Sequence, residues 1–227
     1  MTDQSESRFQ RIVALKKGEP VPKNAYQLTD KEILEIQHKR IENFQPQSEM
    51  RMLNYGNHVL GAAVTVSGLI INSIFRKNFR LGGLKVFGTY LPSSILPVLL
   101  SVGVHEFGIK NKILLGREMC STCVSVKGGL CQAFIGLCYP YIVSILTCLP
   151  TAREYFTLPM PSTPKGVGYV RLLRHVSPTS NVILAIGLTN LMIGMAVSKM
   201  ELQTFVKHLS KPPTSPDPSL LEDMVNE

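Results

Sequence analysis

Residues 53–75, LNYGNHVLGAAVTVSGLIINSIF, decide the fold of this chain. Three further apolar runs follow, at residues 84–104, 128–149 and 181–198, and none of the four contains an aspartate or a glutamate. A hydrocarbon core about 30 Å thick requires about 20 apolar residues of helix. In lipid, each backbone amide must also find its hydrogen-bond partner within its own segment. The sequence therefore predicts an all-α membrane protein with four transmembrane helices.

Small residues lie within the first and third runs at positions that suit close helix packing. Gly61, Ser67 and Gly68 belong to the first run, and Gly136 belongs to the third. Small side chains let helix backbones approach one another, which is how helices associate in lipid. We expect these four residues to be helix-packing positions. Two glycines at residues 82–83 predict a tight turn, so the spans should form a small antiparallel bundle with both tails on one side.

The chain is expected to divide into three parts. Residues 1–52 form a polar N-terminal tail with an amphipathic helix. Residues 29–32, TDKE, match a capping box, which predicts where this helix begins. Residues 53–198 form the four-helix transmembrane domain, in which residues 105–127 connect the second and third spans. Residues 199–227 extend the last helix and end in a proline-rich tail. The polar composition of both tails predicts that they are disordered.

The charge balance is explained by membrane topology. The net charge is +8, from 24 Lys and Arg against 16 Asp and Glu. A basic balance can accompany nucleic-acid binding. Here, however, the basic residues lie in the connections between the apolar runs, as in membrane proteins generally. Membrane lipid is therefore an expected partner, and nucleic acid is not.

Cys120 and Cys123 form a C-x-x-C pair between the second and third runs. Such a pair can close a redox disulfide or supply half of a zinc site. The sequence holds no second C-x-x-C and no H-x-x-x-H that would complete a tetrahedral site. An incidental thiol pair is favoured over a disulfide, and a metal site is the least favoured. The other cysteines are small apolar residues of the third run: Cys131, Cys138 and Cys148.

No sequence motif predicts catalysis. The chain has no glycine-rich phosphate loop, no G-x-S-x-G and no H-E-x-x-H. No span carries a charged residue near its middle, as a proton-coupled carrier usually requires. The polar residues within the spans, Asn72, Gln132 and Asn190, are expected to form interhelical hydrogen bonds. We expect the His105–Glu106 doublet to mark a helix end, and we expect no catalytic residue, no metal ligand and no cofactor.

Several motifs in this order resemble the transmembrane protein 126 family. They are SGLIINSIFRK at residues 67–77, CSTC at 120–123, GLCYP at 136–140 and PKG at 164–166. The resemblance covers residues 53–198, and the Cys120–Cys123 pair makes the chain more similar to the A branch of the family than to the B branch. It implies a multi-pass protein of the mitochondrial inner membrane.

The resemblance also implies a function. It suggests a non-enzymatic assembly factor for respiratory complex I (NADH:ubiquinone oxidoreductase), acting as a scaffold or chaperone for the membrane arm. The implied partners are newly made membrane-arm subunits of this respiratory-chain complex and other assembly factors. The family provides no active-site residues to carry over. The alternative from the residues alone is a small multi-span carrier or a thiol-redox membrane protein that uses Cys120 and Cys123.

Overall fold

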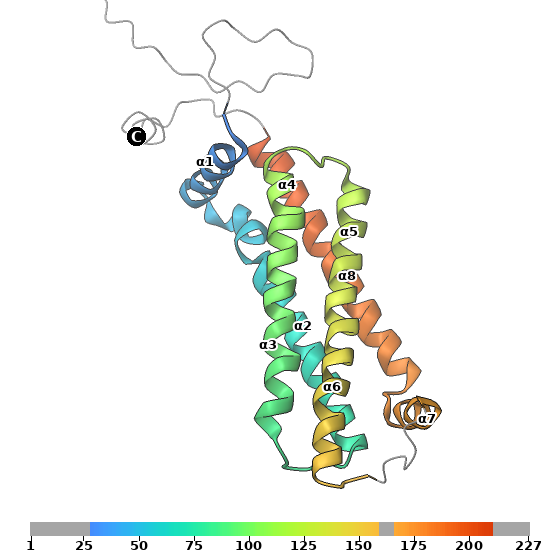
Figure 1. Ribbon diagram of the computed structural model, residues 1–227. Coiled ribbons are helices and arrows are strands. Elements are labelled where there is room, and N and C mark those ends of the chain that lie inside the picture. The colour runs from blue at the N-terminus through green and yellow to red at the C-terminus, as the bar shows by residue number, and fades with distance from the viewer. Residues whose placement is uncertain (1–27, 159–165, 211–227) are drawn as a thin grey trace, which may run out of the picture.

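Four long apolar helical segments lie side by side as a bundle (Figure 1). The computed structural model describes residues 28–158 and 166–210. Within them, the segments long and apolar enough to cross a membrane are Gln47–Asn78, Val86–Leu114, Ser121–Glu154 and Ser180–Leu209. The prediction of an all-α membrane protein with four spans is confirmed. Most of the two tails predicted to be disordered lies outside the described residues.

The N-terminal helix α1 (Asp30–Asn43) begins at the predicted capping box. The Thr29 hydroxyl accepts a hydrogen bond from the backbone N–H of Glu32, and the Glu32 carboxylate accepts one from the backbone N–H of Thr29. These two bonds satisfy backbone donors that a helix start leaves free. Ile41 on α1 is buried against the end of the bundle, so α1 packs as an amphipathic helix.

The first two spans form a helical hairpin. Helix α2 (Arg51–Asn78) and helix α3 (Val86–His105) are joined by a turn in which Gly82 and Lys85 have positive φ angles. Arg76 at the end of α2 is buried and donates to Thr89 Oγ1 at 2.6 Å, to the Gly82 carbonyl at 2.6 Å and to the Leu84 carbonyl at 3.0 Å. A buried guanidinium with its donors satisfied in this way holds the turn to both helices.

The expectation that residues 105–127 connect the second and third spans is wrong for most of that stretch. Helix α3 continues through a π-helical turn, η2 (Glu106–Lys110), into α4 (Asn111–Leu114). Lys110 and Glu106 form an ion pair of 3.1 Å one helical turn apart, and Ile109 and Ile113 are buried. The charges are thus compensated within the helix while its apolar side packs on the bundle. The helix therefore continues past the end of the apolar run.

The third span also contains a π-helical turn. Helix α5 (Ser121–Ala133) passes through η3 (Phe134–Cys138) into α6 (Tyr139–Glu154). Pro140 lies two residues after the end of this turn. It has no backbone N–H to donate, and a wider turn accommodates such a residue. The short helix α7 (Gly166–Val176) then lies across the end of the bundle that carries the α2–α3 turn (Figure 1).

The last span returns to the end of the bundle at which α1 lies (Figure 1). It consists of α8 (Ser180–Thr204), followed by a π-helical turn, η4 (Phe205–Leu209). The Arg40 side chain of α1 donates to the Leu209 carbonyl at 3.2 Å. The first and last described segments are therefore tied together at one end, as an even number of spans requires.

Two clusters of buried apolar residues lie at opposite ends of the bundle. We call the end at which α1 lies the tail end, and the end that carries the α2–α3 turn the hairpin end (Figure 1). The tail-end cluster consists of Ile41, Met50, Leu53, Ile109, Ile113, Leu114, Val124, Leu202, Phe205 and Leu209. The hairpin-end cluster consists of Ile71, Phe75, Phe79, Leu81, Cys148, Ala152, Val176 and Ile186. Between the clusters, the helices meet through glycines and buried polar side chains. The two ends and the middle of the bundle are thus held together by different interactions.

Candidate functional site

A buried group of polar and ionisable side chains lies next to the tail-end cluster. His105 Nδ1 pairs with Asn57 Oδ1 at 2.9 Å, and Asn57 Nδ2 donates to Glu106 Oε2 at 2.5 Å. Lys110 Nζ is 3.1 Å from the same Glu106 oxygen. On its other side, His105 Nε2 is 3.3 Å from Glu201 Oε2. We call these five residues the buried polar cluster; they connect α2, α3, η2 and α8.

Glu201 is the most enclosed member of the buried polar cluster. Its side chain is 0% exposed, and that of His105 is 4% exposed. Apart from the 3.3 Å approach of His105 Nε2 to Oε2, neither carboxyl oxygen of Glu201 has a hydrogen-bond partner among the described residues. Gly56 on α2 provides the space, because a Cβ there would lie 2.5 Å from Glu201 Oε1. A buried carboxyl group with a single long polar contact is costly, so the surrounding packing must hold it in place.

Sequence reasoning missed this cluster. The fourth apolar run ended at Ser198, so Glu201 was assigned to the extension beyond the membrane domain, and His105–Glu106 was expected to mark a helix end. In the structure, His105 and Glu201 each lie within continuous helix, and their side chains are buried in the bundle. A signal was present, since Asn190, Gly194, Val197 and Glu201 recur at the three-to-four-residue spacing of one helix face.

The predicted packing residues all lie at contacts between helices. A Cβ at Gly61 would lie 3.3 Å from Val98 on α3. A Cβ at Gly68 would clash with the backbone carbonyl oxygen of Ser93, also on α3. On the other side of α2, the Ser67 hydroxyl accepts from Asn190 Nδ2 at 2.7 Å. The fourth position, Gly136, faces the Asn190 side chain of α8, which an added Cβ would strike.

The closest helix pair, α5 with α8, depends on glycines that the sequence analysis did not identify. Gly128 and Gly129 on α5 face Gly194 on α8, where an added Cβ would lie 2.6 Å from the Gly128 carbonyl oxygen and 3.0 Å from the Gly129 Cα. At these distances only hydrogen fits between the two backbones. A spacing search could have found Gly129, which lies seven residues before the predicted packing position Gly136 in the same span.

Polar side chains within the spans form hydrogen bonds between helices, as predicted. Gln132 donates to the Leu60 carbonyl at 3.0 Å and accepts from Ser101 Oγ at 2.8 Å, which joins α5 to α2 and α3. Asn72 Oδ1 on α2 accepts from the Cys148 thiol on α6 at 3.5 Å. Together with the bond from Asn190 to Ser67, these contacts join all four spans. The middle of the bundle is therefore specified by hydrogen bonds as well as by close packing.

Cys120 and Cys123 lie at the start of α5 as free, exposed thiols. Cys120 is the N-cap residue, and its sulfur accepts from the backbone N–H of Cys123 at 3.3 Å. Hydrogen bonds from the thiol and the backbone N–H of Cys123 lower the pKa of the Cys120 thiol. Such a thiol is more reactive toward electrophiles and disulfides than an ordinary one at the same pH. Among the described residues, no group of three or more His, Cys, Asp or Glu side chains is placed to hold a metal ion.

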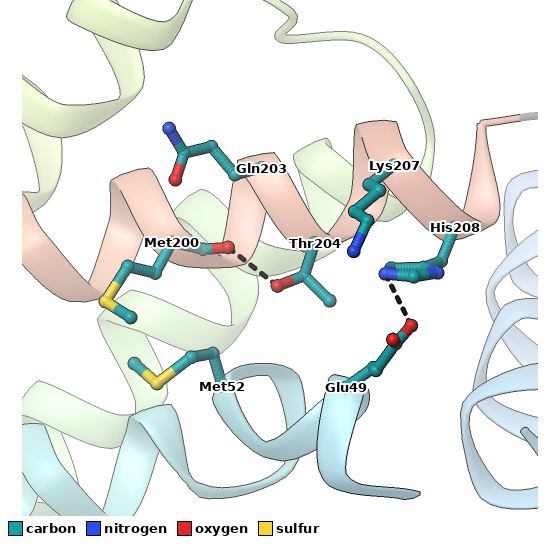
Figure 2. A pocket seen from close by; sticks show the side chains of 7 residues that line it. All are labelled: Glu49, Met52, Met200, Gln203, Thr204, Lys207 and His208. Atoms are coloured by element: carbon teal, nitrogen blue, oxygen red, sulfur yellow. Dashed lines mark hydrogen bonds and ion pairs between the residues drawn. The ribbon is translucent and has the colours of Figure 1, made fainter. Parts of the chain in front are cut away.

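An open pocket of about 210 Å³ lies beside the tail end, between the start of α2 and the last turns of α8 (Figure 2). Glu49 and His208 form an ion pair of 2.9 Å across it, and Met52 and Met200 provide its apolar side (Figure 2). Gln203, Thr204 and Lys207 complete the lining. The ion pair links the short helix η1 (Gln47–Met50), which precedes α2, to η4. These polar groups therefore connect the start of the first span to the end of the last.

One known family model matches most of the chain. The family model described as Transmembrane protein 126 matches residues 31–215. The chain belongs to the transmembrane protein 126 family. The match extends beyond the residues that carried the resemblance, to α1 at one end and η4 at the other. It thus includes the buried polar cluster and both ends of the bundle.

Named members of the transmembrane protein 126 family are similar at moderate identity. Transmembrane protein 126 of Drosophila melanogaster is 29% identical over 71% of this chain and 74% of its own length. Transmembrane protein 126A of Mus musculus is 27% identical over 57% of this chain and 65% of its own. The mitochondrial complex I assembly factor TMEM126B of Mus musculus is 26% identical over 59% of this chain and 56% of its own length. No solved structure matches the chain.

Proposed function

We propose that this protein is a non-enzymatic scaffold of the mitochondrial inner membrane that assists assembly of the membrane arm of respiratory complex I. The observation that carries the proposal is its membership of a family in which a mouse relative is a mitochondrial complex I assembly factor. The partners we propose are newly made membrane-arm subunits and other assembly factors.

The distribution of apolar surface supports a scaffold. Large apolar side chains are exposed on every span, for example Val66 at 56%, Leu99 at 64%, Leu146 at 65% and Leu188 at 51%. Within the bundle, glycine contacts and hydrogen bonds leave the helices closely packed. A rigid bundle with an apolar exterior can hold an incomplete hydrophobic subunit by side-chain packing in lipid. We therefore place the working surface on the outside of the bundle.

The tail end offers a second type of surface. Here α1, held by Ile41 and by the Arg40 bond to Leu209, extends beyond the spans with many charged residues. Arg117 pairs with Asp30 at 2.7 Å and so ties the α4–α5 connection to α1. A soluble segment docked on the bundle could contact assembly factors outside the lipid, while the spans contact membrane subunits.

The test is assembly in cells that lack the protein. Loss should lower the amount of mature complex I and lead to accumulation of incomplete membrane-arm intermediates on native gels, and re-expression of the full chain should reverse both effects. A matched variant that melts at the wild-type temperature but carries polar residues on one exposed apolar face should rescue poorly. Normal membrane-arm assembly without the protein would reject the proposal.

A thiol-redox function is the second candidate, and the geometry of the Cys120–Cys123 pair favours it. The lowered pKa of Cys120 and its exposure suit attack on a protein disulfide. Under the scaffold proposal, Cys120→Ser/Cys123→Ser restores complex I assembly in cells lacking the protein. If this double variant is as abundant as the wild type but rescues no better than an empty vector, the redox function replaces the scaffold.

A further inference from the structure

A groove of about 330 Å³ lies between α5 and α8, and no residue of the buried polar cluster lines it. Its volume is at the lower end of the range typical of ligand sites, and it opens to the outside of the bundle. One side is polar, formed by Ser121, Thr122, Ser125 and Lys199. The other is apolar, formed by Val126, Met192, Met195 and Ala196. We call this feature the α5–α8 groove.

The polar and apolar sides follow the depth of the membrane. The apolar runs of the third and fourth spans begin at Gly128 and end at Ser198, and in the structure these two residues face each other directly. Both helices continue beyond this contact, but both apolar runs stop there, so we take it as the level of the lipid–water boundary. Lys199, Ser121 and the other polar lining residues lie on the tail side of it. The methionines on α8 lie on the membrane side, so the groove crosses the lipid–water boundary.

Lys199 gives the groove its charge. It is exposed, and within the described residues no carboxylate pairs with it. It is also the one charged residue among the eight that line the groove. By contrast, the exposed Lys127 nearby on α5 is paired with Glu118 at 2.5 Å. An unpaired ammonium at the membrane boundary attracts anionic lipid head groups.

We propose that the α5–α8 groove binds an anionic phospholipid. The phosphate lies between Lys199 and the hydroxyl groups of Ser121 and Thr122, which can each donate a hydrogen bond to it. The first part of one acyl chain follows Met192, Met195 and Ala196 toward the membrane centre. Methionine side chains adapt readily to a flexible chain. The bound lipid would extend the contact between α5 and α8, whose backbones already meet at Gly128 and Gly194.

The proposal is tested by titrating lipid into the full-length protein purified in detergent. Dioleoyl-phosphatidylglycerol and dioleoyl-phosphatidylcholine carry the same chains but differ in net charge. Native mass spectrometry then reports each bound lipid. We expect the wild type to bind phosphatidylglycerol more tightly and Lys199→Gln to weaken that binding about fivefold. Binding of phosphatidylcholine should change little, and Lys199→Arg should retain the preference for phosphatidylglycerol.

Lys207→Gln is the matched control. Lys207 is also exposed on the last helical segment, but it lines the pocket that holds the Glu49–His208 ion pair (Figure 2). This variant should bind phosphatidylglycerol like the wild type, and an equal loss in both variants would overturn the proposal in favour of a general charge effect.

Two further measurements separate the lipid from its parts. Excess inorganic phosphate should not displace the bound lipid, because phosphate cannot fill the apolar side; displacement would show a simple anion site and overturn the proposal. Ala196→Phe places a ring in the apolar half at an exposed position, and it should weaken binding of both lipids. Unchanged binding of both lipids to Ala196→Phe would likewise contradict the proposed path of the chain.

Discussion

Gly194→Ala should destabilise the bundle although it adds a single methyl group. The new Cβ would lie 2.6 Å from Gln132 Cβ and 2.6 Å from the Gly128 carbonyl oxygen. Ordinary contacts begin near 3.4 Å, so α5 and α8 must separate by about 0.8 Å at their closest point. One of the atoms struck is backbone and cannot move aside by changing rotamer. Overpacking of this kind costs about 1–3 kcal/mol.

Thermal unfolding in detergent, followed by circular dichroism, measures this cost. For a chain of this size, about 1 kcal/mol corresponds to about 2–4 °C in melting temperature, so Gly194→Ala should melt about 2–12 °C below the wild type. Gly103→Ala is the matched control, because Gly103 also lies in a span but has nothing within 4 Å of its added Cβ. If Gly194→Ala melts at the wild-type temperature, or if the control variant falls by as much, then the close contact between α5 and α8 does not stabilise the bundle as described.

Three other substitutions have expected outcomes. Gly68→Leu should lower protein abundance in membranes and complex I assembly with it, since the added side chain meets the backbone of Ser93; normal levels of both would contradict a packing role. Cys123→Ala removes the thiol whose hydrogen bond lowers the pKa of Cys120. Iodoacetamide reacts with the thiolate form, so labelling of Cys120 should require a higher pH in this variant. An unchanged pH midpoint of labelling would exclude the hydrogen bond from the Cys123 thiol to Cys120. Glu201→Gln should keep the melting temperature within about 2 °C, because the amide keeps the shape of the carboxyl group and can still contact His105 Nε2, which lies 3.3 Å from Glu201 Oε2. A larger fall would show that the charge of the carboxylate itself stabilises the bundle.

The number and type of the spans could be predicted because lipid imposes a simple rule. Apolar length and internal hydrogen bonding are local properties of the sequence. The capping box at Thr29 and the turn at Gly82 were predictable for the same reason, since each depends on residues a few positions apart. Hydropathy did not predict that helix continues through Glu106 and Lys110. A charged residue ends an apolar run, but it need not end a helix when its partner is one turn away.

The buried polar cluster was less predictable because it depends on tertiary contacts. Nothing in the sequence places His105 of the second span beside Glu201 of the fourth, and each lies just beyond an apolar run. The same holds for Gly128 and Gly194, whose importance comes from the approach of two helices. Gly68 and Gly136 were identifiable as small residues, but their contacts with α3 and α8 required the fold.

We propose above that this protein contacts newly made membrane-arm subunits during complex I assembly. The most direct test is a pulse label of mitochondrial translation products, followed by gentle solubilisation and capture of the tagged full-length protein. We expect labelled complex I membrane-arm subunits to be captured early in the chase and to be released as mature complex I forms. Recovery of no labelled complex I subunit, with an abundant and folded protein, would contradict it.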